Sequence, residues 1–196
     1  MKLNNILMIL AIIVIGVALF NLGITINKVR DLTGYATSTG EANLTIESAA
    51  SVNFSIDSIN WGSGYVNTSF SNATLNTEGV MTGVDWNTIT SGLLLENLGN
   101  TNVTVNLSSS KNSTDFIGGA GPSFKWKVVE NETNSCQGAT NITSYTDVTV
   151  ATQLACDNLG YILTKNALEI DLELNISSDA IGAKGCIITA TATALA

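Results

Sequence analysis

Acidic side chains occupy every second position at Glu169, Asp171 and Glu173, and they are the first candidates for chemistry in this 196-residue chain. Side chains two apart in a β-strand share one face at roughly 6–7 Å. Carboxylates at that spacing could form an acid–base pair or a cation site. Calcium, however, requires a wrapped shell of about six to eight oxygens, which a flat row does not supply. We therefore interpret these residues as a solvent-facing row.

Two loop segments carry oxygen ligands at short spacing, Asp157-Asn158 and Asp85 with Asn87, and each is a candidate for binding a cation. The Asp-x-Asp-x-Asp-Gly calcium loop does not occur in the chain. The glycine-rich run 118–122 is not followed by the Lys-Ser/Thr of a phosphate-binding loop, so we expect a turn there. The sequence predicts no metal and no cofactor.

The composition excludes most catalytic mechanisms and one class of partner. The chain has no His, which rules out Ser-His-Asp and Cys-His nucleophiles, His-ligated zinc and the commonest general base. The formal net charge of −8 repels phosphate backbones, so nucleic acid is a poor partner. We expect a protein that is not an enzyme, with no catalytic residues.

Three cysteines allow three pairings, and their surroundings favour one of them. Cys136 and Cys156 both lie in polar, turn-like segments, whereas Cys186 opens a strand on the face shared with Ile188 and Ala190. One disulfide with one unpaired cysteine left over is consistent with the oxidising environment outside the cell. We expect a Cys136–Cys156 disulfide, with Cys186 as a small buried hydrophobe or, alternatively, an intersubunit disulfide.

Aromatic side chains make up 6% of the chain and are scattered along it. A carbohydrate-stacking platform would need several of them on one exposed face. Their scatter favours packing in the core and at sheet edges. The set comprises Trp61, Trp86, Trp126, Tyr35, Tyr65, Tyr145 and Tyr161.

The amino-terminal region contains a segment that could cross a membrane. After a short tail, residues 1–5, residues 6–26 are free of charge and long enough for a hydrocarbon core of about 30 Å. The alternative is a cleaved signal peptide, with Gly34-Tyr35-Ala36 as the small-x-small site. Because that site lies ten residues past Ile26 and charges intervene, we favour a retained single-pass anchor.

Ten N-x-S/T sequons support export of the remaining chain, since a random order of the same residues predicts about five. Part of this excess follows from alternating strands, which place Asn and Thr on one exposed face. We expect a glycosylated extracellular domain with the short amino end inside. The candidate sites are Asn43, Asn53, Asn67, Asn72, Asn102, Asn106, Asn112, Asn131, Asn141 and Asn175.

Period-two alternation predicts the elements that position these residues. Residues 27–50 form a polar tether with one possible strand, Ala42–Glu47, and residues 51–196 form the ectodomain. Alternation is clearest in 102–108 and 168–176, and Asn97-Leu98-Gly99-Asn100 predicts a hairpin between 92–96 and 102–108. About eight or nine short strands favour a mainly β fold, an antiparallel β-sandwich or jelly roll behind one transmembrane helix. The other expected strands are 52–56, 93–95, 124–129, 145–150 and 187–193.

Three motifs carry a resemblance to a known group of proteins. The runs Ile59–Gly64, Leu93–Thr104 and Phe124–Val128 resemble uncharacterised membrane-anchored, N-glycosylated β-sandwich surface proteins of small-genome archaea. The layout is also similar to TasA-like fibre subunits and to archaeal type IV pilins, although Met1–Asn5 contains no Lys/Arg-Gly processing site. The resemblance implies a role at the cell surface and supplies no catalytic residues.

These observations predict a structural glycoprotein at the cell membrane, part of the envelope or of a lattice with surface-layer neighbours or further copies. A second hypothesis is a secreted filament subunit, released by cleavage near Ala36, in which the segment around Leu44 and Ile46 completes a neighbour's sheet. A third is a carbohydrate or cell-adhesion module, for which Trp and Tyr clustered on one face would be the sign.

Overall fold

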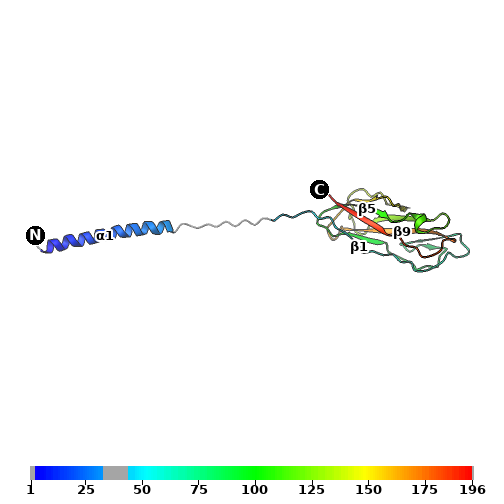
Figure 1. Cartoon of the computed structure of the whole chain (residues 1–196), viewed down its shortest axis with the longest axis horizontal. Helices are drawn as coiled ribbons and strands as arrows, with labels where there is room; N and C mark the ends of the chain where they lie inside the picture. The colour runs from blue at the N-terminus through cyan, green and yellow to red at the C-terminus, as the bar shows by residue number, and fades with distance from the viewer. Residues whose placement is uncertain (1–2, 33–43, 196) are drawn as a thin grey trace. The chain divides into compact units, whose positions relative to one another are not determined.

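The computed structural model describes residues 3–32 and 44–195, and the side chains of 3–26 and 44–195 (Figure 1). The chain divides into two units, Met1–Thr45 and Ile46–Ala196, and each is described by itself. The strand expected at Ala42–Glu47 does not form within its described part, since Leu44–Glu47 has no strand structure. The first two residues of that expected strand, Ala42 and Asn43, lie outside the described residues. So do Tyr35, Ala36 and the candidate glycosylation site at Asn43.

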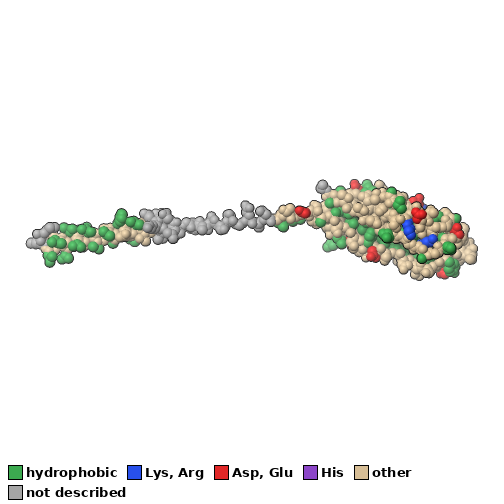
Figure 2. Space-filling model, in the orientation of Figure 1, with side chains coloured by type: hydrophobic (Ala, Val, Ile, Leu, Met, Phe, Trp, Pro, Cys, Tyr) green, Lys and Arg blue, Asp and Glu red, His purple; other side chains and the backbone are tan. Residues whose placement is uncertain are grey.

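Helix α1, Leu3–Leu32, forms the first unit and extends beyond residues 6–26 at both ends. Between Leu3 and Ile26 it contains no Asp, Glu, Lys or Arg, and hydrophobic side chains cover its surface (Figure 2). These 24 residues span about 36 Å at 1.5 Å per residue, more than the hydrocarbon core of a bilayer. The helix is therefore long and apolar enough to cross a membrane.

The second unit is mainly β and consists of two antiparallel sheets in a sandwich-like arrangement. Ten strands and one short helix follow one another along the chain. They are β1 Val52–Ile56, β2 Asn72–Asn76, β3 Met81–Thr82, β4 Leu93–Asn97, β5 Val103–Ser109, α2 Ser113–Phe116, β6 Ser123–Glu130, β7 Thr146–Asp147, β8 Gln153–Leu159, β9 Ala167–Ser177 and β10 Ile188–Ala194.

Strand β9 organises the larger sheet because it is long enough to pair with three strands. Along one edge it pairs with β6, which in turn pairs with β7. Along its other edge β9 pairs first with β4 and then with β2, and these continue to β1 and β3. The smaller sheet has the order β10-β5-β8.

Alternation places the apolar side chains of both sheets in one core. In β5, Val103, Val105 and Leu107 are fully buried, whereas Asn106 is partly exposed on the opposite face. The core also contains Trp126 from β6, whose indole Nε1 donates to Gln153 Oε1 at 2.8 Å. The sandwich thus buries its largest side chain without leaving its polar atom unpaired.

The hairpin expected at Asn97–Asn100 is wrong, because β4 and β5 belong to different sheets. Asn97 is buried, and its side-chain amide donates to the carbonyl of Thr101 at 2.9 Å and to that of Gly160 at 3.1 Å. Its Oδ1 accepts the backbone N–H of Gly99 at 3.0 Å. The buried amide holds the chain as it crosses from one layer of the sandwich to the other.

Several other elements differ from the sequence expectations. The strand expected at 145–150 shortens to β7, and the structure adds β2, β3, β8 and the helix α2. Cys156 was expected in a turn but lies in β8, fully buried, and Cys186 precedes β10 instead of opening it.

A disulfide joins Cys136 to Cys156, the pair that the sequence favours. Their Cα atoms are 5.8 Å apart, within the normal range for a bridge. The bridge ties the segment before β7 to the smaller sheet, and closing a loop of this length contributes roughly 3 kcal/mol through the unfolded chain.

Candidate functional site

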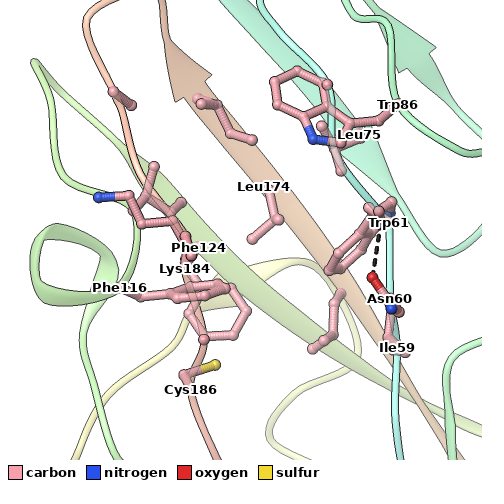
Figure 3. Close-up of a pocket in the computed structure, with 18 of the residues that line it drawn as sticks. Ile59, Asn60, Trp61, Leu75, Trp86, Phe116, Phe124, Leu174, Lys184 and Cys186 are labelled. Atoms are coloured by element: carbon pink, nitrogen blue, oxygen red, sulfur yellow. Dashed lines mark hydrogen bonds between the residues drawn. The ribbon is translucent and has the colours of Figure 1, made fainter.

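A cleft of about 920 Å³ opens between the segments 57–66 and 178–188 (Figure 3). Its floor is the part of the larger sheet where β2, β6 and β9 lie side by side. Figure 3 shows Leu174 of β9 on this floor, with Trp61 on one side and Phe116 on the other. The buried floor residues are Leu75, Phe124, Leu172 and Leu174.

One wall of the cleft is an aromatic platform formed by Trp61, Tyr65 and Trp86. Two backbone hydrogen bonds align the segments that carry them: Asn87 N–H donates to the carbonyl of Trp61 at 3.0 Å, and Asp85 N–H to that of Tyr65 at 3.2 Å. The backbone therefore aligns the two segments that carry the platform.

Gly64 allows the close approach on which the platform depends. A Cβ at this position would lie 2.5 Å from Cδ2 of Trp86, a distance that real Cβ atoms essentially never show. Any other residue would clash with the Trp86 ring and, closer still, with the backbone carbonyl of Asp85. The platform thus requires glycine at position 64.

The indole N–H of Trp61 is a buried donor with no hydrogen-bond partner in the part of the chain that the structure describes. Buried polar groups are nearly always paired, and an unpaired donor costs about 1–3 kcal/mol. The Trp61 N–H is therefore an unpaired donor that lies beneath the surface of the cleft wall.

The opposite wall is a segment without regular structure, residues 178–187, tied down by polar contacts. Lys111 Nζ donates to the carbonyl of Gly185 at 2.7 Å, and Ser110 N–H donates to that of Ile187 at 2.8 Å. At its start, Asp179 accepts the N–H of Ala120 at 3.1 Å and hydrogen-bonds with Ser177.

Cys186 lies half-buried in this wall. Burial raises the pKa of its thiol, although a hydrogen bond from Ser109 and the charge of Lys111 act in the other direction. The thiol therefore stays protonated near neutral pH and is a weak nucleophile.

The aromatic side chains follow the expected packing in part: Trp126 lies in the hydrophobic core and Trp61 and Trp86 pack against it, whereas Tyr65 is exposed. The sequence does not predict that Trp61, Tyr65 and Trp86 line one cleft. The signal available in the sequence is the spacing Trp61-x-x-x-Tyr65 around two glycines. It carries no periodicity, which is why strand analysis misses it.

No family model matches the chain, and searches of curated proteins and of solved structures find no match either.

The carboxylate row of β9 is not the solvated face that the sequence suggests. Asp171 is only 4% exposed, and its carboxylate accepts a hydrogen bond from Thr77 Oγ1 at 2.8 Å. Lys127 Nζ lies 3.5 Å from Asp171 and 2.7 Å from Glu78. Thr77 follows β2 and covers Asp171, which therefore sits in a paired polar cluster, whereas Glu169 and Glu173 are partly exposed.

Protonation within this cluster follows from its geometry. The hydrogen bond from Lys127, helped by one from Tyr145, holds the pKa of Glu78 below its usual value. Burial acts to lower the pKa of Lys127, but the bond to Glu78 and the charge of Asp171 outweigh it and the pKa is raised. Burial, and then the hydrogen bond to Glu78, raises the pKa of Tyr145. The cluster therefore keeps its charges across neutral pH and acts as a structural element.

The other two carboxylates of the row and the two candidate cation loops do not come together in one site. Glu169 accepts the N–H of Gly92 at 2.7 Å, and Glu173 lies 3.8 Å from Lys125. Asp157 is exposed on β8, and Asp85 lies beside the aromatic platform. Among residues 3–32 and 44–195, no group of three or more His, Cys, Asp or Glu side chains is placed to hold a metal ion.

Most candidate glycosylation sites within the described residues are open to solvent. Asn53, Asn67, Asn72, Asn112, Asn131 and Asn141 are exposed, and Asn102, Asn106 and Asn175 are partly exposed. Asn72 Nδ2 donates to Asn175 Oδ1 at 3.2 Å, across the pairing of β2 with β9. These two candidate sites therefore share one patch of surface.

Proposed function

We propose that this chain is a non-enzymatic structural glycoprotein of the cell surface, held by α1 in the membrane with its β-sandwich outside. The observation that carries the proposal is α1, an apolar helix long enough to span a bilayer and followed in the chain by a separate folded unit. Two features support an exterior location of that unit: its disulfide, which persists in oxidising compartments, and its accessible sequons.

The surface of the second unit suits a role in a crowded envelope. Neutral polar side chains and backbone cover most of the visible face, with few charges (Figure 2). Thr189, Thr191 and Thr193 stand in a row on the exposed face of β10. Hydroxyl and amide groups of this kind keep a surface hydrated through hydrogen bonds to water.

Protease added to intact cells should remove everything beyond about Arg30, because the proposed topology leaves only the amino end inside. Immunoblots against the carboxyl-terminal region, before and after lysis, give the measurement. Protection of that region until lysis would contradict the outside location. Mass spectrometry of the mature amino terminus separates a retained anchor from cleavage near Ala36.

A second candidate function is carbohydrate binding in the cleft, favoured by the clustering of Trp61, Tyr65 and Trp86. Sugars present apolar ring faces that stack on aromatic side chains, and oxygens that accept from a donor such as Trp61 Nε1. A free donor and an aromatic wall are the two features that such a ligand needs.

Trp61→Phe keeps an aromatic face but removes the N–H and the five-membered ring, so it should weaken sugar binding by at least about 5-fold, the value of one neutral hydrogen bond of about 1 kcal/mol. A glycan array screens for the sugar, and titration of the best ligand gives the affinity. Tyr145→Phe is the control, since its hydroxyl contacts Glu78 away from the cleft. Equal affinities for Trp61→Phe and the unsubstituted protein would argue against this site.

The filament hypothesis keeps one supporting observation. Leu44 and Ile46 are exposed and alternate with polar residues, as a strand donated to a neighbouring copy would require. Such a subunit would be released by cleavage near Ala36.

A further inference from the structure

The turn between β8 and β9 presents three consecutive apolar side chains to solvent. Tyr161 is 45% exposed, Ile162 58% and Leu163 83%. The backbone shapes this turn without them, because Lys165 N–H donates to the carbonyl of Ile162 at 2.7 Å and Gly160 N–H donates to that of Ser135 at 2.9 Å. The three side chains are not part of the hydrophobic core. Nothing in the fold of the second unit requires them to be apolar.

This turn lies at the end of the sandwich where the chain enters from the tether. Asn97 connects this turn to the start of the second unit. Its side-chain amide donates to the carbonyl of Gly160, and the residues that follow Asn97 pair with residues 49–51. In that pairing, Leu98 N–H donates to the carbonyl of Ser51 at 2.8 Å and Asn100 N–H to that of Ala49 at 3.2 Å. Leu98 is itself exposed. We call Leu98, Tyr161, Ile162 and Leu163 the tether-end patch.

Two occupants could cover the tether-end patch: a second copy of the chain or a lipid bilayer. A standard protein interface uses roughly 20–30 residues a side, far more than these four. A bilayer needs no complementary partner surface. Tyrosine, with an apolar ring and a polar tip, also suits the boundary between headgroups and acyl chains.

The tether makes the bilayer contact feasible at low intrinsic affinity. Residues 27–45 connect Ile26 at the end of the apolar span to Ile46 at the start of the second unit. Even fully extended, these 20 steps reach only about 66–72 Å. A domain held within that distance meets the membrane at a high effective concentration, so burial of a few side chains is sufficient for docking.

We propose that the tether-end patch docks on the bilayer, with Tyr161, Ile162 and Leu163 inserted at the level of the headgroups and upper acyl chains. This inference rests on the proposed function, because it assumes that α1 anchors the chain. Docking would hold the sandwich against the membrane and direct its opposite end, with the aromatic cleft, away from the surface.

Depth-dependent quenching tests the proposal on the full chain. In a Cys186→Ser background, which removes the free thiol, Leu163→Cys carries an environment-sensitive nitrobenzoxadiazole label in phosphatidylcholine vesicles. Ile181→Cys is the matched control, since Ile181 is also 83% exposed and follows the other end of β9. Lipids brominated near the top of the acyl chain should quench the label at 163 several-fold more than the label at 181.

The outcomes separate this inference from the proposed function. If the protein floats with the vesicles but labels 163 and 181 are quenched equally, docking is wrong and the anchor stands. A blue-shifted label at 163 without quenching by brominated lipid would mean that the patch meets another copy, which also overturns the proposal. Failure of the chain to float with vesicles would instead reject the anchor. Tyr161→Ser with Ile162→Ser should reduce the quenching at 163 while flotation is retained.

Discussion

Val105→Asp should abolish stable folding of the sandwich. Val105 is fully buried in the central strand of the smaller sheet, paired with β8 on one side and β10 on the other. An aspartate there would place an unpaired charge in the core at a cost of several kcal/mol, comparable to the roughly 5–15 kcal/mol by which a whole domain is stable. Thermal unfolding followed by circular dichroism measures the loss.

Asn106→Asp is the matched control for this prediction, because it introduces the same side chain one residue further along β5. Asn106 faces outward, opposite Thr191 of β10. Its replacement should cost less than about 1 kcal/mol. Equal losses in the two variants, or a larger loss in Asn106→Asp, would show that the register of β5 is wrong.

Lys127→Met should lower the free energy of unfolding by about 3 kcal/mol. The substitution keeps the apolar stem but leaves the Asp171 carboxylate without its cation, and removing one partner of a buried pair is strongly destabilising. For a domain of about 150 residues, this corresponds to a fall in Tm of roughly 6–12 °C. Differential scanning calorimetry gives both quantities.

Lys125→Met provides the comparison, two residues away on the same face of β6. Its ammonium lies 3.8 Å from Glu173 and its side chain is 34% exposed, against 16% for Lys127. A pair of this kind contributes less than about 1 kcal/mol. Adding Asp171→Asn to Lys127→Met should restore most of the lost stability, and a double variant as unstable as Lys127→Met alone would mean that the charge of Asp171 is not the cause.

Strands with one clean buried face can be predicted from this sequence, and strands without one cannot. β5 alternates apolar and polar residues from Val103 to Ser108 and β9 from Leu168 to Ser177, so a period of two identifies them. β2, with the sequence NATLN, and β8, with QLACDNL, contain few branched or aromatic side chains. Their strand structure comes from pairing with β9 and β5, which are distant in the chain.

Turn residues predict a reversal of the chain but not which strand the chain meets afterwards. The Asn-Leu-Gly-Asn pattern does mark the end of β4. Whether β5 pairs with β4 or joins the other sheet depends on Asn97, whose buried amide binds carbonyls of the neighbouring turn. The choice of sheet therefore depends on the positions of the Thr101 and Gly160 carbonyls, which the four-residue motif does not specify.

The candidate cleft was beyond sequence analysis for a related reason. Its walls are segments without regular alternation, 57–66 and 178–188, and they meet only because β9 carries the second of them across the sheet. The same holds for the cluster around Asp171, where Thr77 comes from the end of β2 and Lys127 from the middle of β6. Alternation locates the carboxylates on a face, and only tertiary structure shows that the face is covered.

The position of β10 governs the order in which this protein can fold. β5 is the central strand of the smaller sheet, yet its partner β10 is made after all the other strands. The 85 residues that separate Ser109 from Ala194 (194 − 109) take about 4–17 s to synthesise at roughly 5–20 residues per second. During that interval β5 has an open edge, which is a template for wrong pairing.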